Sequence, residues 1–275
     1  MSVFNKIIEF LAFTWNEPKP FGIYHIICVL IEAVLIFYVV KYCRRVSDRG
    51  YRMLVLSLWG VMVVFEIYKQ IVYSYTSGEG WDYSWYSFPF QLCSTPLYLL
   101  PLIAFLKDGN VRDACMAFIA TYSLFGGLTV FAYPDTVFVE TLGVNLQTMV
   151  HHGIQILLGV YTAVIMHKRI DRRFYLGATA VFALCLAVAL ILNLSVYEYL
   201  IAIGSTDSFN MFFISPYFNC DLPVFSNLIY PNVPYALFLA IYVFGFAFVA
   251  FIIYAAERAL AKKFSGDLKN AEKEF

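Results

Sequence analysis

Two reactive residue types occur within apolar stretches of this chain: a cysteine, Cys93, and two adjacent histidines, His151 and His152. A cysteine becomes a nucleophile when it is ionised, and a neighbouring imidazole can accept its proton. We therefore interpret Cys93 as a candidate nucleophile and His152 as its general base. His151 is the alternative base, because neighbours on a helix point about 100° apart. The simpler interpretation is that Cys93 only fills space, as buried cysteines in membrane proteins usually do.

The residues around Cys93 indicate an interrupted helix. Pro89 and Pro96 flank it, and a proline removes a main-chain donor and clashes with the preceding helical turn. Thr95 followed by Pro96 is a typical helix start, with threonine as N-cap and proline at the first helical position. We therefore expect Cys93 just before a helix N-terminus, where the positive end of the helix dipole favours a thiolate.

Three ionisable residues, Glu32, Glu66 and Lys69, also fall in apolar stretches. A charge at membrane depth costs several kcal/mol, so such groups normally face a cavity or a partner. Glu66 and Lys69 are three residues apart and can pair on one helix, where the pair serves either helix packing or function. Glu32 has no such neighbour in the sequence, and it could orient a histidine of another helix. We count Glu32 and Glu66 among the residues that support the site.

The composition shows which solvent surrounds these residues. The chain has 275 residues, of which 61% are hydrophobic and 14% charged, and its net charge is zero. Soluble domains are about 45–50% apolar and about 25% charged, so this composition indicates a membrane protein. It excludes a disordered chain and gives no basic stripe for nucleic acid. The sequence has no glycine-rich phosphate motif, and it predicts neither a cofactor nor a metal site.

The elements that must position the reactive residues are membrane helices, each of which needs about 20 mostly apolar residues. Seven stretches qualify, which predicts an all-α polytopic membrane protein built as a seven-transmembrane-helix bundle. The predicted spans are residues 21–43, 52–75, 88–106, 112–133, 145–166, 174–194 and 233–254.

The distribution of lysine and arginine predicts how the bundle is oriented. The first, third and fifth loops and the C-terminal tail carry basic residues, whereas the second, fourth and sixth loops carry none. By the positive-inside rule, the N-terminus lies outside and the C-terminus in the cytoplasm. Cys93 and His152 then lie roughly 8 and 10 Å below the outer surface, at matching depth.

Three regions flank or join the spans. Residues 1–20 are expected to form an interfacial amphipathic segment, because apolar residues recur there at helical spacing. The outer loop 195–232 is long and aromatic, which favours a lid over an outward-facing cavity. Residues 255–275 form the charged cytoplasmic tail, and residues 21–254 the membrane domain.

Five segments resemble a known family. They are residues 88–93 (FPFQLC), 97–102 (LYLLPL), 133–135 (YPD), 151–153 (HHG) and 210–213 (NMFF). Their order and spacing are similar to the bacterial YwaF proteins, which are related to animal transmembrane protein 164. In the match, the second histidine of HHG aligns with the histidine of the family.

This resemblance implies an acyltransferase that moves a fatty acyl chain from a phospholipid to a lysophospholipid without coenzyme A. It implies Cys93 as nucleophile and His152 as base. Gln91, Asp135 and Asn210 lie in the matching segments and are expected to support the site or bind substrate. The expected location is the bacterial cytoplasmic membrane, with the active site toward the outer leaflet.

Two other functions remain open. A proton-coupled transporter of small molecules would use Glu32 and Glu66, since membrane-buried carboxylates serve as proton relays. A lipid-ester hydrolase would use the same cysteine with water as acceptor. Loss of function in Glu32→Gln or Glu66→Gln, with Cys93→Ala still active, would indicate the transporter.

Overall fold

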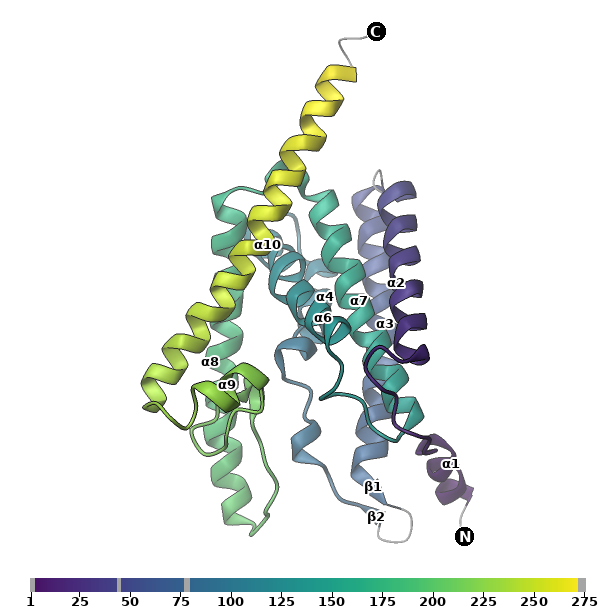
Figure 1. Cartoon of the computed structure of the whole chain (residues 1–275), viewed down its shortest axis with the longest axis vertical. Coiled ribbons are helices and arrows are strands. Elements are labelled where there is room, and N and C mark those ends of the chain that lie inside the picture. The colour runs from purple at the N-terminus through teal and green to yellow at the C-terminus, as the bar shows by residue number, and fades with distance from the viewer. Residues whose placement is uncertain (1–2, 44–45, 77–79, 272–275) are drawn as a thin grey trace.

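The computed structural model describes residues 3–43, 46–76 and 80–271, which form a bundle of helices with roughly parallel long axes (Figure 1). Six of the helices in this described part are long and apolar enough to cross a membrane, counting α5 to α6 as one. A short hairpin of two strands with two residues each, β1 (Tyr75–Thr76) and β2 (Gly80–Trp81), follows the end of α3. The helices are α1 (Val3–Leu11), α2 (Ile23–Tyr42), α3 (Asp48–Ser74), α4 (Pro96–Phe105), α5 (Asn110–Phe118), α6 (Leu124–Ala132), α7 (Leu142–Ile165), α8 (Arg172–Ala202), α9 (Pro223–Leu228) and α10 (Tyr235–Ala271).

Burial in the bundle has the pattern of a membrane protein. Large apolar side chains such as Leu30, Leu184 and Phe244 point outward and are more than half exposed. Polar side chains such as Gln155 and Thr162 are almost completely buried in the interior. Lipid is the only solvent in which this distribution is favourable, because each outward apolar chain would otherwise meet water.

The helix α7 is central to the arrangement. It packs against α2 and α3 on one side and against α6 on the other, while α5 packs against α8. Figure 1 shows α8 and α10 on the opposite side of the bundle from α2 and α3, with α4 and α6 between them. A π-helical turn, η3 (Ile119–Ser123), joins α5 and α6 into one continuous span and is fully buried against α7.

The third predicted span, 88–106, is not a continuous helix. Residues 88–91 are not helical, η2 (Leu92–Ser94) is a 3-10 turn, and only α4 is a regular helix, of 10 residues. The described part of the chain therefore contains six full-length candidate spans and one half-length apolar helix instead of seven equal helices. The reason is the one expected from Pro89 and Pro96, which remove main-chain donors from the first half of the stretch.

The interrupted stretch nevertheless runs alongside α3 for most of its length. At one end the Gln70 side chain donates to the Ser87 carbonyl (2.7 Å), and at the other the Arg52 guanidinium donates to the Leu106 carbonyl (2.6 Å). Gln70 and Arg52 are about 27 Å apart along a helix. The stretch therefore covers nearly the thickness of a hydrocarbon core, although only half of it is helical.

The remaining predicted elements have counterparts in the structure. The other six spans correspond to α2, α3, α5 to α6, α7, α8 and α10. The helix α2 is shorter than predicted, and the other five are longer, α8 with 31 residues and α10 with 37 by the largest margins. The predicted interfacial segment contains α1, and the predicted tail continues α10 as far as Ala271. The loop predicted at 195–232 is shorter than expected, because α8 extends to Ala202 and α9 forms within it.

A polar cluster, which we call the arginine cluster, lies where α3, α4 and α5 meet. Arg112 is 3% exposed, and its guanidinium donates to the Ile103 carbonyl (2.9 Å), to Asp48 (2.6 Å) and to Asp108. Arg52 bonds to the same two carboxylates. Since each guanidinium nitrogen has an acceptor, this cluster joins the ends of three helices without an unpaired charge.

Candidate active site

Cys93 lies in the 3-10 turn η2, directly before α4. Thr95 is the N-cap residue of α4 and Pro96 its first residue, as predicted, although the Thr95 hydroxyl donates to the Leu92 carbonyl (2.7 Å) instead of to the helix. Cys93 is half-buried. The sequence prediction of a cysteine just before a helix N-terminus is therefore confirmed.

Two side chains of α7 hold the main chain of Cys93. His151 Nε2 lies 2.9 Å from the Cys93 carbonyl oxygen, and Gln155 Nε2 donates to the same oxygen at 3.0 Å. Because a carbonyl only accepts, His151 carries its hydrogen on Nε2 and leaves a lone pair on Nδ1. That Nδ1 atom and Gln155 Oε1 are buried without a hydrogen-bond partner.

His152 adopts the tautomer in which Nε2 can accept a proton. Its Nδ1 lies 2.8 Å from the Thr148 carbonyl one turn earlier in α7, so Nδ1 carries the hydrogen and Nε2 the lone pair. The ring centroids of His151 and His152 are 5.6 Å apart, with an edge-to-face orientation. Among the described residues, the hydrogen bonds join His151, not His152, to Cys93.

A polar network on α3 reaches the segment that precedes Cys93. Lys69 Nζ is 2.9 Å from Glu66 Oε1, as expected from their spacing, and Gln70 Nε2 donates to the same oxygen at 2.7 Å. Gln70 also donates to the Ser87 carbonyl. The second carboxylate oxygen of Glu66 is buried without a partner. This network therefore links α3 to the start of the cysteine segment.

Lys69 brings a positive charge to the region of the reactive residues. Its ammonium group is close enough to interact electrostatically with Cys93, His151 and His152. A positive charge in a low-dielectric interior stabilises a nearby thiolate or oxyanion. The pair with Glu66 reduces this effect but leaves the ammonium with further donors.

Glu32 reaches α7 beside the histidine pair. It is 8% exposed and lies so close to Gly153 that a Cβ atom there would be 2.8 Å from Glu32 Oε2. Its other oxygen, Oε1, is buried without a partner. No described hydrogen bond joins Glu32 to His151 or His152, so the structure brings it next to the histidines without showing that it orients them.

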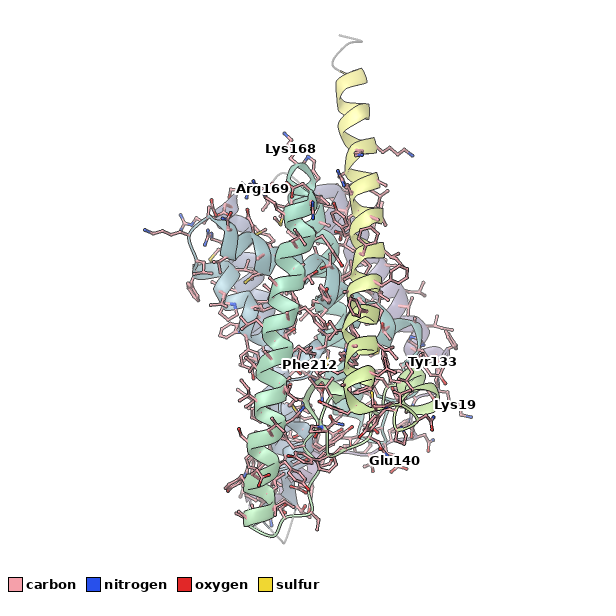
Figure 2. The ribbon with its side chains drawn as sticks, turned by 90° about the vertical axis from the view of Figure 1, so that its left-hand side faces the viewer. Lys19, Tyr133, Glu140, Lys168, Arg169 and Phe212 are labelled. Carbon is pink, nitrogen blue, oxygen red and sulfur yellow. The ribbon has the colours of Figure 1, made fainter. Side chains whose placement is uncertain are left out.

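Gln91 ties the cysteine segment to the outer loop. Its amide nitrogen donates to the Asn210 carbonyl (2.9 Å), and its amide oxygen accepts from the Phe212 N–H (2.7 Å). Phe212 and Phe213 have φ values of 57° and 55°, which non-glycine residues seldom adopt. Figure 2 shows Phe212 between α8 and α10, inside the bundle. The loop is therefore fastened over the segment that contains Cys93.

The Asn210 side chain is used within the loop itself. Its amide nitrogen donates to the Asn219 carbonyl and its oxygen accepts from the Ser215 N–H, both at 2.8 Å. Asn193 of α8 makes two further hydrogen bonds, with the main-chain N–H and carbonyl of Met211. Both asparagines thus fix the shape of the loop.

Asp135 lies apart from this cluster. It is exposed in the turn after α6, and its carboxylate accepts a hydrogen bond from the Tyr133 hydroxyl (3.1 Å). Cys220, in the outer loop, is 1% exposed, and burial raises the pKa of its thiol to about 11. Neither residue is joined to Cys93 by a described contact.

Gln155 is the residue of this cluster that the sequence analysis did not identify as part of the site. Its position in the sequence could have identified it, since Gln155 follows His151 by four residues and therefore lies on the same face of α7. A further buried histidine, His25, has a structural role: it accepts from the Phe21 N–H and bonds to the Phe131 carbonyl.

Comparison with known proteins identifies one family. No curated protein and no solved structure is similar enough to this chain to count as a match. The sequence model of the TMEM164 family matches residues 20–256, which include every full-length candidate span except the end of the last. The match covers both the cysteine segment and the histidine pair, and the chain therefore belongs to the TMEM164 family.

Proposed function

We propose that this protein is a membrane acyltransferase that moves a fatty acyl chain from a phospholipid to a lysophospholipid through a thioester on Cys93. The observation that carries the proposal is the contact of 2.9 Å between His151 Nε2 and the Cys93 carbonyl, because it joins the cysteine segment to the helix that bears both histidines. The family match supports the same chemistry, which the resemblance of residues 88–93 and 151–153 implies.

In the first half-reaction, His152 Nε2 accepts the proton of the Cys93 thiol. The thiolate attacks the carbonyl carbon of the phospholipid ester and forms a tetrahedral intermediate. The ester C–O bond then breaks, and the lysophospholipid leaves as its oxygen takes the proton from the His152 imidazolium.

In the second half-reaction, the hydroxyl group of another lysophospholipid gives its proton to His152 Nε2 and attacks the thioester. The C–S bond breaks, and the Cys93 thiolate recovers the proton. One ester replaces another of similar free energy, so the exchange needs no nucleotide or coenzyme A. Water as the second acceptor would make the same site a hydrolase.

We assign two groups to stabilise the oxyanion in this proposal. The N–H groups of Ser94 and Thr95 donate to the Gln91 and Leu92 carbonyls, whereas the N–H of Cys93 interacts with the thiol of its own residue. That N–H and the ammonium of Lys69 are the donors we assign. The Asn210 amide, the other donor considered from the sequence, is occupied within the loop.

The substrate would enter from the lipid. Cys93 is half-buried beneath the outer loop, and in the orientation predicted by the positive-inside rule this is the outer-leaflet side. An outer-leaflet phospholipid could then diffuse sideways to the cysteine without leaving the membrane.

The test is intact-protein mass spectrometry after incubation with one defined phospholipid. We expect a mass increase of one acyl chain that hydroxylamine removes, an equal amount of lysophospholipid, and neither product with Cys93→Ala. His152→Ala, which lacks the base of both half-reactions, should release lysophospholipid more slowly than wild type. If neither wild type nor His152→Ala gives an adduct or lysophospholipid, the thioester mechanism is wrong.

One observation favours the transporter as the second candidate. Glu32 and Glu66 each hold one carboxylate oxygen that is buried without a partner, as a proton-carrying group would. Proton uptake by proteoliposomes would separate the candidates: transport requires both carboxylates, and acyl transfer requires Cys93.

A further inference from the structure

A groove lies between the first turns of α8 and the second half of α10. It has a volume of about 660 Å³, within the usual range for a small-molecule site. Its floor is aromatic: the ring centroid of Tyr175 is 5.5 Å from that of Phe251 and 5.5 Å from that of Tyr254. Ala255 and Ala259 of α10 also line the groove, and their small side chains leave it open.

Three cations line the same groove: Arg172, Arg258 and Lys262. Arg258 donates to the Tyr254 hydroxyl (3.1 Å), and its guanidinium lies over the ring of Tyr254. In the described part of the chain, none of the three cations forms a salt bridge, and no carboxylate lines the groove. The groove therefore has a net positive charge at one end and an apolar surface at the other.

In the described part of the chain, the neighbouring carboxylates form no ion pair with these cations. Asp171 accepts from the N–H groups of Arg173 and Phe174 as the N-cap of α8. Glu257 precedes Arg258, but both of its oxygens are buried away from the surface. Three cations without an ion-pair partner beside aromatic rings suit an anionic ligand with an apolar part.

The groove is remote from Cys93. Asn193 bonds to Met211 at the level of the cysteine segment, and it is about 30 Å along α8 from Arg172. Figure 2 shows the same separation, with Lys168 and Arg169 at one end of the bundle and Phe212 far along it. A ligand in the groove is therefore distinct from a substrate at Cys93.

We propose that this groove binds one anionic phospholipid, with its phosphate at Arg172, Arg258 and Lys262 and an acyl chain on Tyr175 and Phe251. Basic pockets between helices at the cytoplasmic end of membrane proteins bind acidic headgroups. A lipid is the occupant, and not free phosphate, because the groove continues from the cations onto an apolar surface that faces the membrane. This site does not depend on the proposed acyl transfer.

The test is native mass spectrometry of the full chain in a neutral detergent, titrated with dioleoyl phosphatidylglycerol and with dioleoyl phosphatidylcholine. We expect one phosphatidylglycerol to bind in preference to phosphatidylcholine. The variant with Arg172→Gln, Arg258→Gln and Lys262→Gln should bind it on the order of 100-fold more weakly, at about fivefold for each cation. Glycerol 3-phosphate at millimolar concentration should not compete.

The matched control removes the same charge elsewhere, with Lys107→Gln, Lys168→Gln and Lys263→Gln. All three are exposed and none lines the groove, so affinity should stay near that of wild type. Equal loss in both triple variants, or no loss in the first, would overturn the proposal. So would tight binding of glycerol 3-phosphate.

A second variant keeps the test valid if the triple variant does not fold. Ala255→Trp fills the groove without changing charge, and it should weaken phosphatidylglycerol binding by at least about tenfold. Unchanged binding in Ala255→Trp, with a thermal unfolding midpoint like that of wild type, would show that the lipid does not occupy the groove.

Discussion

The polar cluster at Cys93 and the arginine cluster at Arg112 both lie within an apolar bundle, yet they pair their buried groups differently. Each guanidinium nitrogen of Arg112 has an acceptor. Around Cys93, by contrast, His151 Nδ1, Gln155 Oε1 and Glu66 Oε2 are buried without a partner. A buried polar atom without a partner costs about 1–3 kcal/mol, so a structure keeps several of them only for a reason. We infer that the arginine cluster holds helices together and that the cluster at Cys93 is built for a ligand.

The largest effect that tests this comparison is loss of the nucleophile. Cys93→Ala should lower acyl transfer by on the order of 10³ or more and leave the unfolding midpoint nearly unchanged, because the side chain is only half-buried. The measurement is transfer of a labelled acyl chain between lipids in proteoliposomes. Cys185→Ala, also half-buried, is the matched control and should retain activity. Equal activity in the two variants would exclude Cys93 as nucleophile.

The next largest effect is a difference in acyl-transfer rate between variants of the two histidines. His152→Gln removes the lone pair on Nε2 and should lower acyl transfer by about 10²- to 10⁴-fold. His151→Gln keeps an N–H that can donate to the Cys93 carbonyl, so its loss should be about tenfold or less. The measurement is the acyl-transfer rate of both variants in the same assay. A larger loss in His151→Gln than in His152→Gln would make His151 the base.

A substitution in the arginine cluster should lower the stability of the protein without changing acyl transfer. Arg112→Met removes one of the two cations that pair with Asp48 and Asp108, and it leaves the Ile103 carbonyl without its donor. It should lower the free energy of unfolding by about 2–3 kcal/mol, somewhat below the range for fully buried pairs. The carboxylates are partly exposed, with 51% and 64% of their side-chain surface accessible, which reduces the cost. Thermal unfolding in detergent measures it, with activity per folded molecule unchanged.

Arg169→Met is the matched control for that prediction. Arg169 pairs with Asp113 at 3.0 Å but is 62% exposed, so its loss should cost less than about 1 kcal/mol. If Arg112→Met unfolded no more easily than Arg169→Met, or lost its activity while folded, the structural role of the arginine cluster would be wrong.

A smaller effect is expected at Gln155. Gln155→Leu removes one of two donors to the Cys93 carbonyl together with one unpaired oxygen, so stability should change little. Acyl transfer should fall by about tenfold, since the nucleophile is held less firmly. A lower unfolding midpoint with unchanged turnover would instead give Gln155 a purely structural role.

The smallest effect is expected at Glu66. Glu66→Gln retains an acceptor for Lys69 and Gln70, so acyl transfer should change by less than about fivefold. Complete loss of activity in Glu66→Gln, with Cys93→Ala still active, would favour the transporter instead.

The sequence alone determined the local features. Six of the predicted spans correspond to full-length helices because the length of an apolar run is a property of the run itself. The helix start at Thr95 and Pro96 and the pair between Glu66 and Lys69 were predictable for the same reason, as each depends on residues a few positions apart. The break in the third span also followed from its prolines, although its half-length helix did not.

Only the tertiary structure decided which distant groups meet. The contact between His151 and Cys93 joins residues 58 positions apart, and that between Gln91 and Asn210 joins residues 119 apart. The sequence predicted matching depth for Cys93 and the histidines, but depth does not specify rotation about a helix axis, and one residue turns the side chain by about 100°. The packing of α7 against the cysteine segment fixes that rotation, and it places His151 and Gln155 on the Cys93 carbonyl.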